Sequence, residues 1–170
     1  EWRGVHYKWW IGTVAGLVAL HFYAAGAAAA YQPRRLPFLF FLLSVYLVVR
    51  AAFVFLSPIG APVGMVDMRV HDLIFSRLLG TWTFTNEFIF SGHTSIPFLF
   101  FLFFRTRGLK ILMLAGSLLM AVCVLLSRNH YTVDVLAAFL VSYSVYAFSE
   151  AAYERWVRPL FQDDDARRPA

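Results

Sequence analysis

The 170-residue sequence contains one cysteine, Cys123, and few charged residues. A single thiol cannot build a disulfide framework or a cysteine-rich zinc site, so folds that depend on either are excluded. Charged residues make up 15% of the chain, whereas soluble proteins contain roughly 25%. Hydrophobic residues reach 60%, above the roughly 45 to 50% of soluble domains. The composition therefore excludes an ordinary water-soluble domain and indicates an integral membrane protein.

The excess of basic residues does not indicate a nucleic-acid partner. The net charge is +5 and the isoelectric point about 9.7, but the basic residues lie at the ends of apolar runs, where they set membrane topology. No positively charged segment with a short apolar stretch and a cleavage site begins the chain, so we expect no signal peptide. Because the sequence starts at Glu1 rather than at Met, we expect a trimmed or incompletely covered product.

Apolar runs of membrane-spanning length predict an all-α, polytopic transmembrane helix bundle. We expect one transmembrane catalytic domain over residues 1–160 and a polar tail over residues 161–170. Five spans are predicted: Trp9–Ala30, Leu36–Ser57, Phe88–Phe104, Leu109–Leu126 and Val133–Phe148.

The distribution of lysine and arginine predicts the orientation in the membrane, since cytoplasmic loops retain positive charge. Nine basic residues fall on one side: Arg34, Arg35, Arg105, Arg107, Lys110, Arg155, Arg158, Arg167 and Arg168. Five fall on the other: Arg3, Lys8, Arg69, Arg77 and Arg128. The less basic side, which holds the starts of the third and fifth spans, is therefore predicted to face the exterior, the periplasm or a lumen.

Four ionisable residues inside or at the edge of these spans lie near the predicted exterior ends of their helices: Arg50, His93, His130 and Asp134. Each costs about 2.5 to 3.5 kcal/mol on insertion scales and so requires a partner or a function. All four fall near the predicted exterior end of their helices. We therefore expect them to converge, although they come from three segments.

His130 and Asp134 are four residues apart, which places them on one helix face about 6 Å apart along the axis. A carboxylate there can accept the Nδ1 proton of the imidazole and leave Nε2 as a nucleophile or base. The alternative is a structural pair that only stabilises the helix entrance.

His93 lies in the segment Ser91-Gly92-His93, where Ser91 is a candidate N-cap and Gly92 allows close approach of a ligand. Amide groups at a helix start attract phosphate oxygens, and a guanidinium such as that of Arg50 or Arg128 binds phosphate through two donors. The alternatives are a solvated histidine and an Arg50 that extends to the head-group region. Without a His-x-x-x-His pair or an Asp-rich cluster, we expect neither a metal site nor a cofactor.

These motifs resemble the sphingomyelin synthase family, a branch of the type 2 phosphatidic acid phosphatase superfamily. The resemblance covers Arg50 to Phe148 and rests on Ser91-Gly92-His93 and His130-Tyr131-Thr132-Val133-Asp134. The Lys-x6-Arg-Pro motif of the phosphatases is absent, and Arg128 lies closer to His130 than the phosphatase spacing requires. The family implies six spans, so either a first helix precedes Glu1 or the chain is a shorter relative.

The resemblance implies a lipid phosphotransferase in which His130 is the nucleophile, His93 exchanges protons and Asp134 orients His130. Arg50 and Arg128 would hold the phosphate, with Ser91 and Gly92 at the substrate. Glu87 would contact a cationic head group, or else be a solvated loop charge. The partners would be a phospholipid donor such as phosphatidylcholine and a lipid hydroxyl acceptor such as ceramide. A lipid phosphatase or phospholipase C-like hydrolase, a non-enzymatic lipid-binding protein and a homo-oligomer are alternatives left open.

Overall fold

The computed structural model describes residues 16, 19–56, 91–126 and 130–160, and every regular element in these ranges is helical. Residues 19–31 form an N-terminal helical segment. The further elements are the 3-10 turn η1 (Pro33–Arg35), α2 (Leu36–Leu56), α4 (Gly92–Phe103), α5 (Arg107–Leu126), α6 (Thr132–Ala152) and the π-helical turn η2 (Tyr153–Val157). The predicted all-α class is confirmed.

Three helical stretches within the described ranges are long and apolar enough to cross a membrane: Pro33–Leu56, Arg107–Leu126 and Thr132–Leu160. They support the prediction of an integral membrane protein. The predicted spans Trp9–Ala30 and Phe88–Phe104 lie partly outside the described residues. The helix found in the second of them, α4, has 12 residues, fewer than the roughly 20 that a hydrocarbon layer requires.

The last helix is longer than the sequence predicts. The predicted span ends at Phe148, whereas the helix continues through η2 to Leu160. Side-chain pairs four residues apart support the extension, since the Tyr146 hydroxyl donates to Glu150 at 3.0 Å and Arg158 donates to Glu154 at 2.6 Å. Such pairs stabilise a helix after its apolar run has ended.

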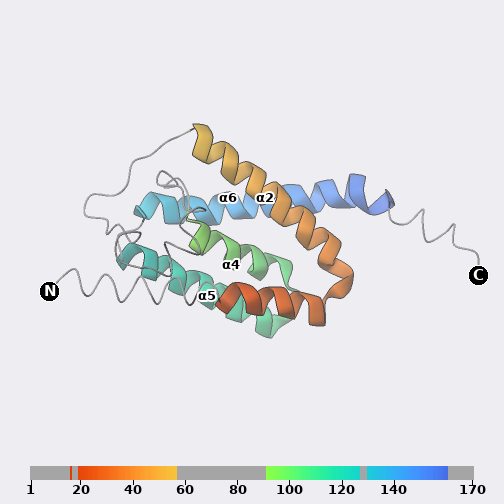
Figure 1. The fold of residues 1–170 in the computed structure, drawn as a ribbon, viewed down its shortest axis with the longest axis horizontal. Coiled ribbons are helices and arrows are strands. Elements are labelled where there is room, and N and C mark those ends of the chain that lie inside the picture. The colour runs from red at the N-terminus through yellow and green to blue at the C-terminus, as the bar shows by residue number, and fades with distance from the viewer. Residues whose placement is uncertain (1–15, 17–18, 57–90, 127–129, 161–170) are drawn as a thin grey trace, which may run out of the picture.

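The short helix α4 occupies the centre of the bundle (Figure 1). It packs against α5 and α6, and α2 packs against α6. The rings of Phe38 and Phe103 stack at 6.3 Å between α2 and α4, and Tyr146 of α6 meets Phe38 edge-on at 5.9 Å. The alternating helix directions bring the ends of α2 and α5 and the starts of α4 and α6 to one end of the bundle (Figure 1).

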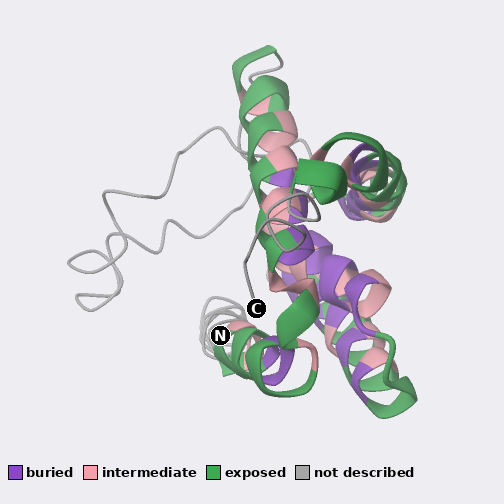
Figure 2. Ribbon diagram, turned by 90° about the vertical axis from the view of Figure 1, so that its right-hand side faces the viewer, coloured by how far each residue is buried: buried purple, intermediate pink, exposed green. Residues whose placement is uncertain are grey.

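The outer faces of the helices are exposed (Figure 2) and carry large apolar side chains, as lipid contact requires. Large exposed hydrophobic side chains include Phe40, Val48, Ile111, Leu119, Leu136 and Leu140. Several serines are instead fully buried, among them Ser117 of α5 and Ser142 of α6. Small residues on the inner faces let membrane helices approach closely.

Two glycines allow the N-terminal part of the chain to approach α5. A Cβ on Gly116 would lie 2.6 Å from Cδ2 of Leu20, and a Cβ on Gly16 would lie 3.0 Å from Cε of Met120. Neither position leaves room for a larger side chain unless its neighbour moves. The segment of residues 19–31 is therefore held against α5 by direct contact at Gly116.

Arg35 connects η1 to the last turn of α4 at the other end of the bundle. Its guanidinium donates to the carbonyl of Phe103 at the last turn of α4, and to Oε1 of Gln32 at 3.4 Å. It also lies over the rings of Phe38 and Phe103, at 5.4 and 4.8 Å from their centroids. A basic side chain at a helix C-terminus satisfies carbonyls that have no partner within the helix.

Replacing Gly116 by leucine should destabilise the protein, because the larger side chain collides with Leu20. Overpacking of this kind costs about 1 to 3 kcal/mol. Thermal unfolding of the purified protein in detergent measures the change. Gly26→Leu is the matched control, since a Cβ at Gly26 meets nothing within 4 Å. Equal stability of the two variants would contradict this packing.

Candidate active site

The polar residues expected to converge meet where α2 ends and where α4 and α6 begin. The position of a Cβ on Gly92 is 3.0 Å from Nη1 of Arg50. The ring centroids of His93 and His130 are 6.1 Å apart. The backbone N–H of Ser91 donates to the carbonyl of Asp134 at 3.4 Å, which ties the start of α4 to α6.

The start of α4 is set by the backbone of Ser91. This residue is extended, with φ −68° and ψ 109°, and its carbonyl accepts the N–H groups of Thr94 at 3.2 Å and Ser95 at 2.9 Å. Ser91 thus occupies the predicted N-cap position, but its hydroxyl makes no capping hydrogen bond. Further along, Pro97 has no N–H to donate to the carbonyl of His93, so the first turns of the helix are loosened.

Hydroxyl groups surround this helix start. Within the described residues, the buried side-chain oxygens of Ser91, Thr94 and Ser95 have no hydrogen-bond partner. The hydroxyl of Ser117, halfway along α5, donates to the carbonyl of Thr94 at 2.8 Å. A buried polar group without a partner costs about 1 to 3 kcal/mol. A polar group bound beside the first turn of α4 would give these hydroxyls hydrogen-bond partners, so its binding is favoured.

Arg50 reaches the helix start because Gly92 has no side chain. The Cβ position of Gly92 is 3.3 Å from Cζ and 3.6 Å from Nη2 of Arg50, in addition to the 3.0 Å to Nη1. The sequence predicts that Gly92 admits a ligand, whereas the close neighbour observed here is the guanidinium of Arg50. That guanidinium lies half-buried beside the amide end of α4. The guanidinium and the helix N–H groups both favour binding of an anion.

His93 and His130 face each other at the same point. Their ring planes are inclined by 64°, so the rings meet edge to face. Both residues are partly buried, and the side chain of His130 is 7% exposed. Two imidazoles at this separation can act on the same small group, one as a nucleophile or base and the other as an acid.

The carboxylate of Asp134 has a structural partner as well as a histidine beside it. Its Oδ2 accepts the backbone N–H of Tyr131 at 2.8 Å, and it lies 3.8 Å from Nδ1 of His130. The predicted i,i+4 neighbours are therefore adjacent, but the distance exceeds that of a hydrogen bond. In free enzymes, hydrogen bonds between a histidine and its carboxylate are often longer than in the substrate complex. Because Asp134 faces Nδ1, it is Nε2 of His130 that remains for chemistry.

His21 is a further residue of this site that the sequence reasoning missed. It lies half-buried in the segment of residues 19–31. It is close enough to His93 for the two imidazoles to interact electrostatically, as His130 and Arg50 also do with His93. The rule that singled out Arg50 would also have found His21, because His21 is an ionisable residue inside a predicted span.

Two predicted substrate contacts, Glu87 and Arg128, lie outside the described residues. Among the described side chains, no group of three or more His, Cys, Asp or Glu residues is arranged to hold a metal ion. The positive charge described at the site comes from Arg50 together with the amide end of α4. Such groups can stabilise the charge of a phosphoryl group during its transfer.

Residues 86–151 match the family model described as PAP2 superfamily C-terminal. The match includes His93, His130 and Asp134 and thus supports the PAP2 superfamily part of the predicted resemblance. It points to a lipid phosphatase or phosphotransferase kind of function, without singling out the sphingomyelin synthase branch. No curated protein and no solved structure matches the chain.

Gly92→Ala should reduce turnover of a lipid phosphoester, because the added methyl group displaces the guanidinium of Arg50. Loss of one charge-assisted hydrogen bond is worth about 1.5 to 3 kcal/mol, so we expect a rate at least roughly tenfold lower. The variant should insert and unfold like the wild type. The measurement is initial rate, with thermal unfolding of the same sample.

Gly108→Ala is the matched control for this variant. Gly108 lies in the first turn of α5, and a Cβ there meets nothing within 4 Å. It should retain full activity. Equal rates for Gly92→Ala and Gly108→Ala would show that Arg50 takes no part in the reaction.

Proposed function

We propose that the protein is a lipid phosphotransferase, similar to sphingomyelin synthases, that moves a phosphorylated head group from a glycerophospholipid to a lipid hydroxyl such as that of ceramide. The observation that carries the proposal is the meeting of His93, His130 and Arg50 at the start of α4. In this proposal one histidine is the nucleophile, the other is the proton donor, and Arg50 with the start of α4 binds the anion.

In the first step, Nε2 of His130 attacks the phosphorus of the donor. The N–P bond forms and the bond from phosphorus to the glycerol oxygen breaks. In the substrate complex, where the anionic phosphate offsets the neighbouring positive charge, protonated His93 gives its proton to the departing oxygen, so that diacylglycerol leaves as a neutral alcohol. Asp134, 3.8 Å from Nδ1 of His130, stabilises the positive charge that develops on this ring.

In the second step, neutral His93 takes the proton from the acceptor hydroxyl. The oxygen of the acceptor attacks phosphorus, and the N–P bond to His130 breaks. Both histidines return to their starting protonation states. His93 thus acts as an acid in the first half-reaction and as a base in the second, while the bond from His130 to phosphorus forms and then breaks.

Arg50 and the first turn of α4 hold the phosphate oxygens throughout. A guanidinium beside a helix N-terminus offers parallel donors and positive charge. The buried hydroxyls of Ser91, Thr94 and Ser95, which lack partners among the described residues, provide further polar contacts. Because these groups are fixed before the substrate arrives, little reorganisation is needed during transfer.

The surroundings of the site favour lipid substrates. Large apolar side chains near the end of α2 are exposed, with Phe55 at 87% and Leu56 at 77%. Near the start of α6, Val133 and Leu136 are also exposed. Donor and acceptor acyl chains can therefore remain in the bilayer while their polar groups enter between the helices.

The charge distribution supports a site on the exterior, periplasmic or luminal face. Basic residues gather at the opposite end of the bundle, around the turn at Arg34 and Arg35 and the connection at Arg105 and Arg107. Positive loops are retained on the cytoplasmic side. The end that holds His93 and His130 would then face away from the cytoplasm.

A lipid phosphatase or phospholipase C-like hydrolase is the second candidate, favoured by the match of residues 86–151 to the PAP2 superfamily model. Water would replace the lipid hydroxyl in the second step. The two histidines would act in the same way in both reactions, so the acceptor distinguishes the candidates.

Purified protein incubated with phosphatidylcholine labelled in its head group should form a phosphorylated product faster when ceramide is present. His130→Ala should abolish both half-reactions, because the proposed covalent intermediate forms on Nε2 of His130. Excess EDTA should leave the rate unchanged. Thin-layer separation of all phosphorus-containing products gives the readout.

The control for this experiment replaces the donor with phosphatidic acid. Rapid release of inorganic phosphate with no response to ceramide would establish the hydrolase. Wild-type rates for His130→Ala would refute the histidine mechanism. Absence of turnover with every donor would favour a non-enzymatic lipid-binding protein.

Asp134→Asn should slow the reaction far more than it affects stability. Asparagine keeps an oxygen that can accept the N–H of Tyr131, so the start of α6 is preserved, but the charge beside His130 is lost. The equivalent change in a serine protease triad lowers the rate about 10⁴-fold, and we expect a drop of at least roughly 10²-fold. Single-turnover rates and thermal unfolding measure the two effects.

Asp134→Ala is the comparison for this variant. It loses the hydrogen bond to Tyr131 in addition to the charge, and loss of such a cap costs about 0.5 to 2 kcal/mol of stability. Full activity of Asp134→Asn would mean that His130 and Asp134 form only a structural pair, the alternative left open by the sequence.

A further inference from the structure

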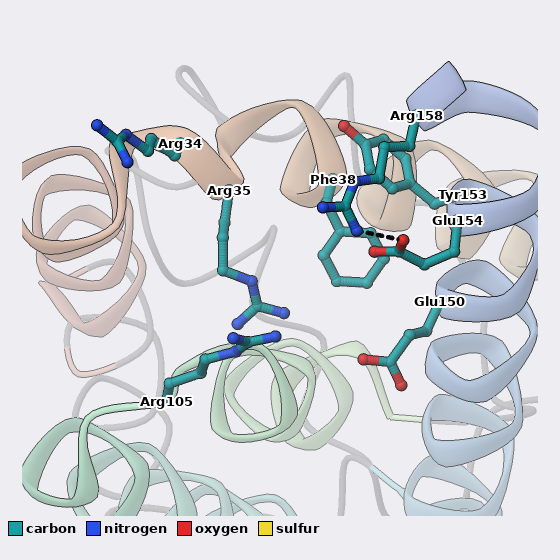
Figure 3. Close-up of a pocket in the computed structure, with 8 residues that line it drawn as sticks. All are labelled: Arg34, Arg35, Phe38, Arg105, Glu150, Tyr153, Glu154 and Arg158. Carbon is teal, nitrogen blue, oxygen red and sulfur yellow. Dashed lines mark hydrogen bonds and ion pairs between the residues drawn. The ribbon is translucent and has the colours of Figure 1, made fainter. Parts of the chain in front are cut away.

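A second polar site lies at the end of the bundle opposite the histidines. It is a pocket of about 300 Å³ between the turn at η1, the connection after α4 and the end of α6 (Figure 3). The aromatic rings of Phe38 and Tyr153, which meet at 5.3 Å, form part of its lining. Along α2, Leu36 near this pocket and Arg50 at the candidate active site are separated by about 21 Å of helix rise, so the two sites are separate.

The charged lining of the pocket is unbalanced. Four arginines and two glutamates line it, an excess of two positive charges: Arg34, Arg35, Arg105 and Arg158 against Glu150 and Glu154. One pair is already formed, because Nη1 of Arg158 lies 2.6 Å from Oε2 of Glu154. The remaining glutamate, Glu150, accepts a hydrogen bond from Tyr146.

Two of the arginines are directed at the same space. In Figure 3, Arg35 and Arg105 extend toward one another from opposite sides of the pocket. Arg35 is held in this direction by the carbonyl of Phe103 and by the rings of Phe38 and Phe103. Among the described residues, neither guanidinium has a carboxylate within ion-pair distance. Like charges facing each other repel, so an anion between them would stabilise this arrangement.

We propose that this pocket binds the phosphate group of an anionic membrane lipid. Two guanidinium groups offer the paired donors that phosphate oxygens accept. Basic pockets between transmembrane helices are suited to anionic head groups.

A lipid is favoured over a soluble phosphate ester because exposed apolar side chains lie on the same helical segments that line the pocket. Phe40 of α2, Trp156 of η2 and Leu160 are 67%, 60% and 70% exposed. An aromatic residue such as Trp156 near the end of a span marks the membrane interface. With its head group in the pocket, a lipid could keep its acyl chains at the apolar outer surface of these helices.

The test uses a photoactivatable phosphatidic acid at low mole fraction in phosphatidylcholine nanodiscs that contain the full chain. After irradiation, peptide mass spectrometry locates the cross-links. We expect labelling of the peptides that contain Phe38 or Tyr153, in addition to any at the histidine site. Arg105→Gln should reduce labelling near the pocket about tenfold, the loss expected for one charge-assisted hydrogen bond. Turnover at the histidine site should remain unchanged.

Arg107→Gln is the matched control. Arg107 is exposed, follows Arg105 by two residues and does not line the pocket. It removes the same charge and should leave the labelling intact. Arg105→Lys keeps the charge without the two-donor fork and should give intermediate labelling.

Three outcomes would overturn the proposal. Equal labelling in Arg105→Gln and Arg107→Gln would mean that net charge alone attracts the lipid. Equal labelling by a photoactivatable phosphatidylcholine would show that the negative head group is not recognised. Loss of labelling in millimolar inorganic phosphate would assign the pocket to a soluble anion instead of a lipid.

Discussion

The central helix α4 is too short to cross a membrane, and the position of the candidate site depends on this short length. Twelve residues rise about 18 Å, against a hydrocarbon layer of about 30 Å. A helix that ends within this depth must have its free N–H groups next to protein or water, not lipid. The longer helices provide that environment, with Ser117 of α5 bonded to the carbonyl of Thr94 and the carbonyl of Asp134 bonded to Ser91. The polar groups of the candidate site therefore lie at the first turn of α4.

At the start of α6, one carboxylate has both a structural role and a proposed catalytic role. Asp134 accepts the backbone N–H of Tyr131 and lies beside Nδ1 of His130. When the first turn of α6 forms, the carboxylate is placed next to the imidazole without a separate positioning residue. Gly92 has a comparable effect, because the absence of a side chain there leaves room for the guanidinium of Arg50. Both features use the backbone of a helix start to position a charged group.

The two ends of the bundle have different chemical characters. At one end, partly buried histidines and Arg50 surround a helix N-terminus. At the other end, arginines outnumber glutamates around an open pocket, and Arg35 satisfies the last turn of α4. The apolar outer faces between them match a bilayer. This separation would place the proposed phosphoryl chemistry and the proposed anionic-lipid binding on opposite sides of the protein.

The sequence by itself determined the membrane class, the helical architecture and the nearness of His130 to Asp134. Hydrophobic run length and helix periodicity are local properties, so they can be read without knowledge of the packing. The continuation of α6 to Leu160 was less accessible, because it depends on side-chain pairs beyond the apolar run. Only the tertiary structure decided that Arg50 lies against Gly92, that His21 approaches His93 and that Arg35 and Arg105 face one pocket. Those contacts join segments far apart in the chain, and they depend on how side-chain volume and glycine gaps set the distances between helices.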